Sequence, residues 1–317
     1  MRICSLVPSA TEILCALGLG EDIVGVSHEC DFPPGIAGKP RVLRTSINQD
    51  ERSSLEIDQV VRASSNRSGS LYQINEALLA RLAPDLVITQ SLCEVCAVDA
   101  ASVEKSVRAV VPRAQVVSLH PHTIEELFKE IRMLGHVTNR SVQARGLVAG
   151  CLARLEQLKR SIPPQSERLR VFCLEWLNPP MASGHWVPEM VACAGGREVL
   201  GRAGQPSRYV TWEEIASAAP EVVVLMPCGF PIERTRREVS LLTAQPAWSA
   251  LPAVRTGRVY LVDGPAYFNR SGPRLIDGIE LLAGLFHPDR CGSPILAFPS
   301  ADQAYLNKPP AQEGLAA

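Results

Sequence analysis

The sequence predicts an α/β protein of two similar Rossmann-like lobes with mainly parallel sheets, joined by a single long backbone helix. Short apolar strands alternate with helical segments along most of the chain, which is the pattern of βαβ units. The order of elements before residue 123 is repeated after residue 169. Between the two repeats, residues 123–162 have the apolar spacing of helix almost throughout.

The helical stretch has clear start and stop signals. Thr123 followed by Glu126 fits a capping box, and a second helix is expected from residue 141 to 161, where Pro163 and Pro164 end it. At about 1.5 Å per residue, that second helix would span roughly 30 Å, the width of a small domain. We interpret it as a rigid spine between the lobes. The alternative is an ordinary surface helix with a kink.

The first lobe is predicted from residues 1–121. Ser9 and Glu12 form a candidate capping box for its first helix. The polar stretch 39–73 is expected to be a long loop with one helical turn near 54–61. The remaining elements follow from apolar runs and turn residues: strands at 3–7, 23–26, 86–89 and 115–119, and helices at 12–17, 75–82 and 100–110.

The second lobe repeats this order. Its strands are expected at 170–174, 222–224 and 258–262, and its main helices at 189–194, from 212 onward, and at 273–285. The full set of predicted domains is residues 1–121, a helical spine at 122–164, a second lobe at 165–290, and an irregular tail at 291–317.

Composition limits the possible partners and the compartment. The chain has 317 residues, a formal net charge of −1 and 46% hydrophobic residues, so nothing favours nucleic acid or an anionic membrane surface. No apolar run approaches the length of a membrane span. Met1 and Arg2 lead directly into a strand, from which we expect no signal peptide and a cytoplasmic location. Ten cysteines in a reducing compartment would be packed thiols, metal ligands or redox groups.

Four of these cysteines follow predicted strands. Cys93 and Cys96 form a C-x-x-C pair, a spacing that suits thiolate ligands of Zn²⁺ or an iron–sulfur cluster, or a redox dithiol. Because ligands bind beyond the carboxyl ends of parallel strands, Cys30 and Cys228 would join them in a cleft between the lobes. His28 is an additional candidate ligand. The alternative is that one or more of these cysteines are packed thiols.

Other strand-end residues suggest a bound macrocycle. Glu175 ends a strand, Trp186 offers a flat aromatic face, and His185 offers a nitrogen for axial ligation. The alternative for Trp186 is packing within its own lobe. Arg270, near the start of the last helix, is suited to ligand carboxylates, phosphate or amides, or to an ion pair with the other lobe.

Several motifs resemble the helical-backbone metal receptors, which are the substrate-binding proteins of ABC importers for cobalamin, iron–siderophores and haem. The resemblance covers about residues 1–287 and is strongest to the cobalamin-binding branch. It rests on the residues at 8–12, 84–88, 178–180 with Gly184, and 268–270 with Pro273 and Arg274. It implies a two-lobe fold with a helical spine, a ligand held between the lobes and little domain closure.

The resemblance also implies roles for particular residues. Tyr267 and Phe268 join Trp186 as candidates for the aromatic residues that flank a corrinoid. Exported members dock onto importer arginines through one Glu on each lobe, to which Glu213 or Glu214 corresponds, together with Glu76, one residue out of register.

Three functions are therefore considered. The first is a cytoplasmic protein that binds a corrinoid or a related metal complex, with an ABC importer as a doubtful partner because export is not expected. The second is a metal- or iron–sulfur-dependent enzyme or redox protein that uses the cysteines. The third is a thiol-rich structural protein. We favour the first, a binding protein rather than an enzyme.

Overall fold

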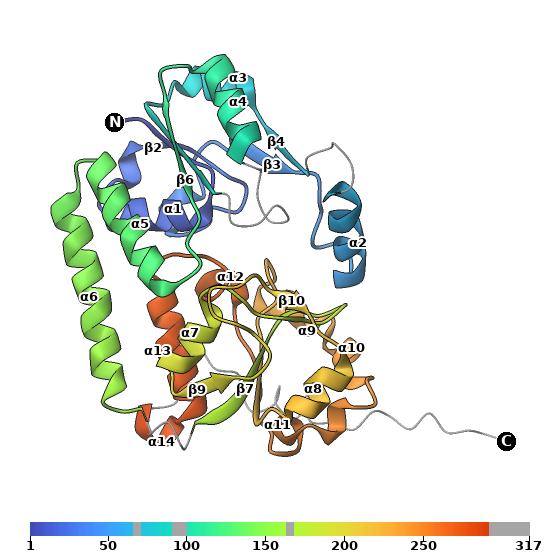
Figure 1. Ribbon diagram of the computed structural model, residues 1–317. Helices are drawn as coiled ribbons and strands as arrows, with labels where there is room; N and C mark the ends of the chain where they lie inside the picture. The colour runs from blue at the N-terminus through green and yellow to red at the C-terminus, as the bar shows by residue number, and fades with distance from the viewer. Residues whose placement is uncertain (66–70, 91–99, 163–167, 292–317) are drawn as a thin grey trace. The chain divides into compact units, whose positions relative to one another are not determined.

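A computed structural model describes residues 1–65, 71–90, 100–162 and 168–291 of the chain. Two compact units are present. The first consists of Met1–Arg52, Glu56–Arg154 and Arg270–Pro273, and the second of Ser53–Leu55, Leu155–Asn269 and the described residues from Arg274 onward. In Figure 1 the first unit runs mostly from blue to green and the second mostly from yellow to red.

The first unit is built on a four-stranded parallel sheet. Its strands are β1 (Ile3–Ser5), β2 (Ile23–Val26), β5 (Leu86–Gln90) and β6 (Gln115–Leu119), in the order β2-β1-β5-β6. Each strand lies where its apolar run predicts it. Their carboxyl ends therefore lie at one edge of the sheet.

Helices α1 (Pro8–Ala16), α3 (Glu76–Leu82), α4 (Ala100–Val110) and α5 (Ile124–Val137) accompany this sheet. Side chains alternate along each strand, so β1 and β5 each bury residues on both faces. On one face, Cys4 and Val87 pack with Leu79 of α3 and with Val103 and Val107 of α4, all at most 1% exposed. Each such apolar side chain contributes about 1.5–3 kcal/mol when it is fully buried.

The polar stretch at 39–73 is more ordered than expected. The 3₁₀ turn η2 (Pro34–Ile36) precedes this stretch. The stretch itself includes a 12-residue helix α2 (Ser54–Ser65) and the strands β3 (Leu43–Thr45) and β4 (Tyr72–Ile74), which pair antiparallel. The prediction of a loop was wrong for the two strands. Each has only three residues, and they form a sheet because a distant segment supplies their hydrogen-bond partners.

Helix α6 (Ser141–Lys159) confirms the predicted long helix and carries the chain from the first unit to the second. The α6 residues up to Arg154 group with the first unit and those from Leu155 with the second. Its buried face is narrower than its apolar residues suggest. Ala144, Val148 and Cys151 are buried, whereas Val142 is 70% exposed. At the start of α5, the Thr123 hydroxyl accepts the Glu126 N–H at 3.1 Å, which is one half of the predicted capping box. The Glu126 carboxylate accepts the His122 N–H at 2.7 Å instead of the Thr123 N–H.

The second unit repeats the parallel sheet of the first. The strands β9 (Gly196–Glu198), β7 (Leu169–Trp176), β11 (Val222–Leu225) and β12 (Val259–Leu261) are parallel and lie in an order equivalent to β2-β1-β5-β6. Two short strands, β8 (Met181–Ala182) and β10 (Arg208–Tyr209), extend the sheet antiparallel beside the end of β7. The predicted fold class, with two similar lobes and mainly parallel sheets, is confirmed.

The helices of the second unit include the three that the sequence predicts. Those three are α7 (Val187–Cys193), α8 (Trp212–Ala218) and α13 (Leu275–Phe286), and α13 packs against α7. The shorter helices of this unit are α9 (Ile232–Arg236), α10 (Val239–Thr243), α11 (Pro252–Arg255), α12 (Gly264–Tyr267) and α14 (Pro288–Cys291), and it also contains the 3₁₀ turn η4 (Trp248–Ala250). The 3₁₀ turn η1 (Gly20–Asp22) belongs to the first unit.

Candidate functional site

In the first unit, residues 28–31 follow β2 at the carboxyl edge of the sheet, and Arg41 holds the backbone of this loop. The Arg41 guanidinium donates at 2.6 Å to the carbonyl of Ser27 and at 2.6 Å to the carbonyl of Cys30. Two short charged hydrogen bonds to backbone carbonyls fix the loop without any ligand.

Arg270 holds the same loop from another segment of the first unit. Its side chain is 12% exposed and its two terminal nitrogens pair with the two carboxylate oxygens of Asp31. It also donates to the Glu29 carbonyl at 3.0 Å and lies 3.7 Å from the Glu12 carboxylate. Of the two roles considered for Arg270, the structure therefore shows an ion pair with the protein's own carboxylates.

Cys30 and His28 have different surroundings within this loop. Cys30 is fully buried, with the hydroxyls of Thr11 and Ser27 each 3.1 Å from its sulfur, and burial raises the pKa of its thiol. Burial, helped by the nearby Arg41 charge, lowers the pKa of His28 to about 4, so its imidazole is neutral at pH 7. The His28 ring lies 5.8 Å from the Tyr72 ring.

The proposed four-thiolate site involves both units and includes residues that the structure does not describe. Cys93 and Cys96 lie outside the described ranges. Within those ranges, no three His, Cys, Asp or Glu side chains gather as a metal ion would require. Cys228 follows β11, is half-buried, and its N–H donates to the Glu175 carbonyl at 2.9 Å. Metal binding by the cysteines stays a prediction.

In the second unit, Glu175 and His185 lie where β7 and β8 end. The Ser207 hydroxyl donates to the Glu175 carboxylate at 2.9 Å. His185 has a left-handed backbone, with φ of 51°, and its N–H donates to the Gln205 carbonyl at 2.6 Å. Gly184 lies against the backbone of the same 205–207 segment. This segment therefore connects the two candidate ligand residues.

The aromatic candidates divide into buried and accessible rings. Trp186 is 4% exposed and Phe268 is fully buried, and the Trp186 indole N–H donates to the Phe268 carbonyl at 2.7 Å. Both therefore belong to the packed interior of the unit. Tyr267 is half-buried, with the Arg274 guanidinium 5.8 Å from its ring centre. Trp176, the half-buried aromatic residue that ends β7, was not among the predicted ligand-binding residues. Its position at the end of a strand could have identified it as a candidate.

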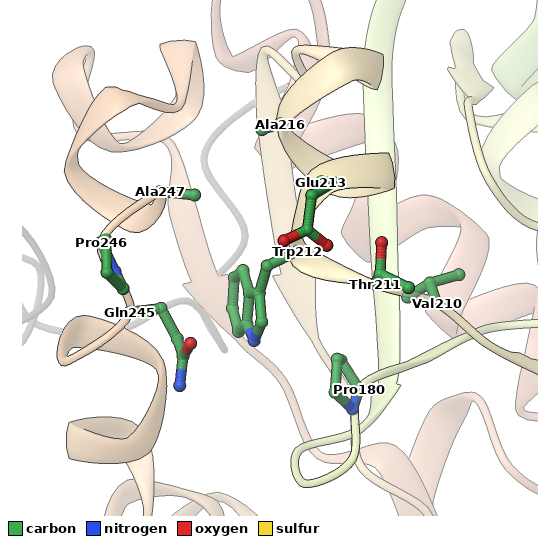
Figure 2. A pocket seen from close by; sticks show the side chains of 9 residues that line it. All are labelled: Pro180, Val210, Thr211, Trp212, Glu213, Ala216, Gln245, Pro246 and Ala247. Atoms are coloured by element: carbon green, nitrogen blue, oxygen red, sulfur yellow. The ribbon is translucent and has the colours of Figure 1, made fainter.

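A hollow of about 480 Å³ opens on the second unit at the start of α8 (Figure 2). The Trp212 ring and the Glu213 carboxylate both face it. The Trp212 ring packs edge-on against buried Trp248, with 6.1 Å between ring centres, so it is held in place. The remaining lining residues are mostly apolar or small: Pro180, Val210, Thr211, Ala216, Gln245, Pro246 and Ala247.

The two candidate docking glutamates of this helix have distinct environments. Glu214 completes a capping box with Thr211 and accepts a hydrogen bond from Arg208 at 2.9 Å. The pKa of Glu213 is lowered by its own backbone N–H and by the Thr211 hydroxyl. Glu213 lines the hollow and Glu214 does not. Glu76, on the first unit, is exposed in the first turn of α3.

A family model described as "Periplasmic binding protein" matches residues 3–266. Among curated proteins, the chain is 27% identical over 293 residues to the "Uncharacterized ABC transporter substrate-binding lipoprotein YvrC" of Bacillus subtilis, covering 91% of this chain and 80% of that protein. It is 24% identical over 286 residues to the vitamin B12-binding protein of Vibrio cholerae, covering 88% of this chain and 86% of that protein.

Solved structures show the same fold at low identity. A periplasmic heme-binding protein from Pseudomonas aeruginosa has a TM-score of 0.69 at 20% identity, covering 91% of this chain and 93% of that one. The periplasmic vitamin B12-binding protein BtuF of Vibrio cholerae has a TM-score of 0.64 at 22% identity, covering 90% and 96%. A possible iron-binding protein from Staphylococcus epidermidis has a TM-score of 0.68 at 23% identity, covering 90% and 97%.

These similarities correct the expected compartment. The matching family model is that of periplasmic proteins, and the relatives include a substrate-binding lipoprotein, which point to a location outside the cytoplasm. The prediction of a cytoplasmic location was wrong, and the doubt about an ABC importer that rested on it is not supported. Among the described helices, none is long and apolar enough to cross a membrane.

Proposed function

Since the chain belongs to the periplasmic binding protein family, we propose that it is the substrate-binding protein of an ABC importer and that its ligand is a corrinoid. One observation carries the choice of ligand: several curated relatives named as vitamin B12-binding proteins align with most of the chain, the Vibrio cholerae protein over 88% of it. Haem and ferric hydroxamates are the ligands to compare, because structural neighbours include a heme-binding protein and a component of an Fe3+-hydroxamate transport system.

We assign the ligand contacts to the loops at the carboxyl edges of the sheets. In the second unit these contacts are Glu175, His185 and Tyr267, which are each partly accessible. Tyr267 would supply the apolar ring face, and His185 a ring nitrogen for polar contact or axial ligation. Trp186 and Phe268 would support them from the interior. Pre-ordered loops limit the affinity lost to ordering on binding.

Titration with hydroxocobalamin is expected to shift its visible absorption bands and to give a saturable calorimetric signal. Tyr267→Ala should weaken binding by roughly 5- to 10-fold, because an aromatic contact with a macrocycle contributes about 1 kcal/mol beyond its buried area. Tyr209→Ala removes a 43% exposed tyrosine from β10 of the same unit and should leave the affinity unchanged. The absence of binding to corrinoids, haem and ferric chelates alike would refute the proposed function.

We further assign Glu213 to importer docking. An exposed carboxylate beside the rim of a fixed indole suits a basic side chain, through an ion pair and a cation–π contact. Glu213→Arg should lower the ligand-stimulated ATPase activity of the reconstituted importer severalfold without changing ligand affinity. The matched control is Glu233→Arg, at an exposed position of the same unit. Equal losses in both variants would count against this contact.

A further inference from the structure

The 28–31 loop of the first unit carries more acidic than basic groups. Three carboxyl groups lie in or against it, those of Glu12, Glu29 and Asp31, with two guanidinium groups, those of Arg41 and Arg270. His28, the other titratable group on the exposed side, is neutral at pH 7. A ligand that approaches this loop therefore meets an excess of carboxylate.

Both guanidinium groups are already engaged by the protein. Arg41 donates to two backbone carbonyls, and Arg270 pairs with Asp31 and Glu12 while donating to the Glu29 carbonyl. Arg270 is 12% exposed, so a ligand carboxylate would have to displace an internal partner to reach it. Among the described residues around this loop, neither arginine is placed to neutralise a ligand anion.

Glu29 and Asp31 are the accessible acidic groups of the loop, with side chains that are 33% and 63% exposed, and Asp31 is the one that pairs with Arg270 through both carboxylate oxygens. The Glu29 backbone is fixed by Arg270 through its carbonyl, whereas the Glu29 side chain lies 3.8 Å from the His28 ring, which is neutral at pH 7. Burial raises the pKa of its carboxyl, with Asp31 adding to the effect and Arg270 opposing it. A ligand carboxylate brought next to Glu29 would raise the free energy of keeping both groups ionised, because two carboxyl groups that share a site do not both ionise freely.

We propose that the 28–31 loop selects macrocycles whose side chains end in neutral amides over macrocycles whose side chains end in carboxylates, and that Glu29 is the discriminating residue. An amide N–H donates to the Glu29 carboxyl group, whereas a ligand carboxylate is repelled by it. The inference rests on the proposed function, since it assumes that a macrocycle reaches this edge of the sheet.

The chemistry of the two ligand classes makes the selection meaningful. Corrinoids carry acetamide and propionamide side chains around the ring, and haem carries two propionates. A site that repels carboxylates therefore favours corrinoids by exclusion, which is a common route to specificity. Hydrolysis of one amide of a corrinoid converts a preferred side chain into a disfavoured one without altering the rest of the ligand.

The test compares cyanocobalamin with its three propionamide-derived monocarboxylic acids, one at a time, by calorimetry at pH 7.5. At least one acid should bind the wild-type protein roughly tenfold more weakly than cyanocobalamin. In the Glu29→Gln variant, the dissociation constants of that acid and of cyanocobalamin should differ by no more than about twofold, mainly because the acid binds more tightly. Glu21→Gln, at an exposed position of the same unit, should leave the ratio unchanged.

A salt series provides the same test without a variant. Raising sodium chloride from about 0.05 to 0.5 M should shrink the wild-type ratio for the affected acid, because added salt screens the repulsion between carboxylates. If cyanocobalamin binds but all three acids bind equally well, or if Glu29→Gln leaves the ratio intact, the inference fails and the proposed function stands. If neither cyanocobalamin nor the acids bind the wild-type protein, the proposed function fails and the inference falls with it.

Discussion

Replacement of Glu238 by alanine is expected to lower the free energy of unfolding by about 3–5 kcal/mol, since it breaks a buried ion pair from one side. Arg234 is 5% exposed and Glu238 is 8% exposed, and their charged groups lie 2.5 Å apart within the second unit. The Glu238 carboxylate also accepts the N–H of Ser54 at 3.0 Å on each oxygen. Alanine leaves the guanidinium buried without this carboxylate and the first turn of α2 without its acceptor.

Urea unfolding followed by circular dichroism measures this loss, and two further variants test its cause. Glu233→Ala removes a carboxylate that is 73% exposed and pairs with Arg236, so it should cost less than about 1 kcal/mol. The double variant Arg234→Met with Glu238→Leu should be more stable than Glu238→Ala alone, because no charge is left buried. A Glu238→Ala loss below about 1 kcal/mol would show that solvent reaches this pair.

Gly184→Ala is expected to destabilise the protein by about 3 kcal/mol, because the added methyl group has no space. A Cβ at this position would lie 2.3 Å from the Gln205 carbonyl oxygen, 2.4 Å from the Ser207 nitrogen and 2.5 Å from the Pro206 carbonyl carbon. All three are backbone atoms, so a side-chain rotation cannot relieve the clash. The 205–207 segment must move, and the hydrogen bond from Ser207 to Glu175 would move with it.

Gly146→Ala is the matched control, since it makes the same chemical change with the opposite expected sign. Gly146 lies in α6, and a Cβ there would meet no atom within 4 Å. Alanine should therefore stabilise the protein by roughly 0.5–1 kcal/mol through its higher helix propensity. Chemical denaturation of both variants provides the comparison. Similar small effects at the two positions would contradict the close backbone approach at Gly184.

Apolar runs and capping residues were sufficient to predict those helices and strands that depend mainly on their own residues. The parallel strands of both units coincide with short apolar runs except β9, whose residues are Gly-Arg-Glu and which was not predicted, and α6 ends close to the prolines that follow it. The repeat of strand order was visible for the same reason, because burial on both faces requires continuous apolar residues. The cap at Thr123 was also predicted correctly, since its partner Glu126 is three residues away.

Local signals failed where the partner is distant in sequence. The strands β3 and β4 form only because they pair with each other, although α2 separates them in the sequence. Ser9 and Glu12 have the spacing of a capping box, yet both are buried inside α1, which begins at Pro8 without a side-chain cap. Glu12 instead lies beside Arg270, whose position next to it depends on the whole fold.

The sequence by itself determined the fold class, the family and the strand ends at which candidate ligand residues lie. Only the tertiary structure decided which of those residues are accessible. Trp186 and Tyr267 are both aromatic residues in strand-end loops, but one is packed within its unit and the other is half-exposed. Glu213 and Glu214 are adjacent, yet only Glu213 faces the hollow in Figure 2. Accessibility depends on what packs against a side chain, and those neighbours come from other parts of the chain.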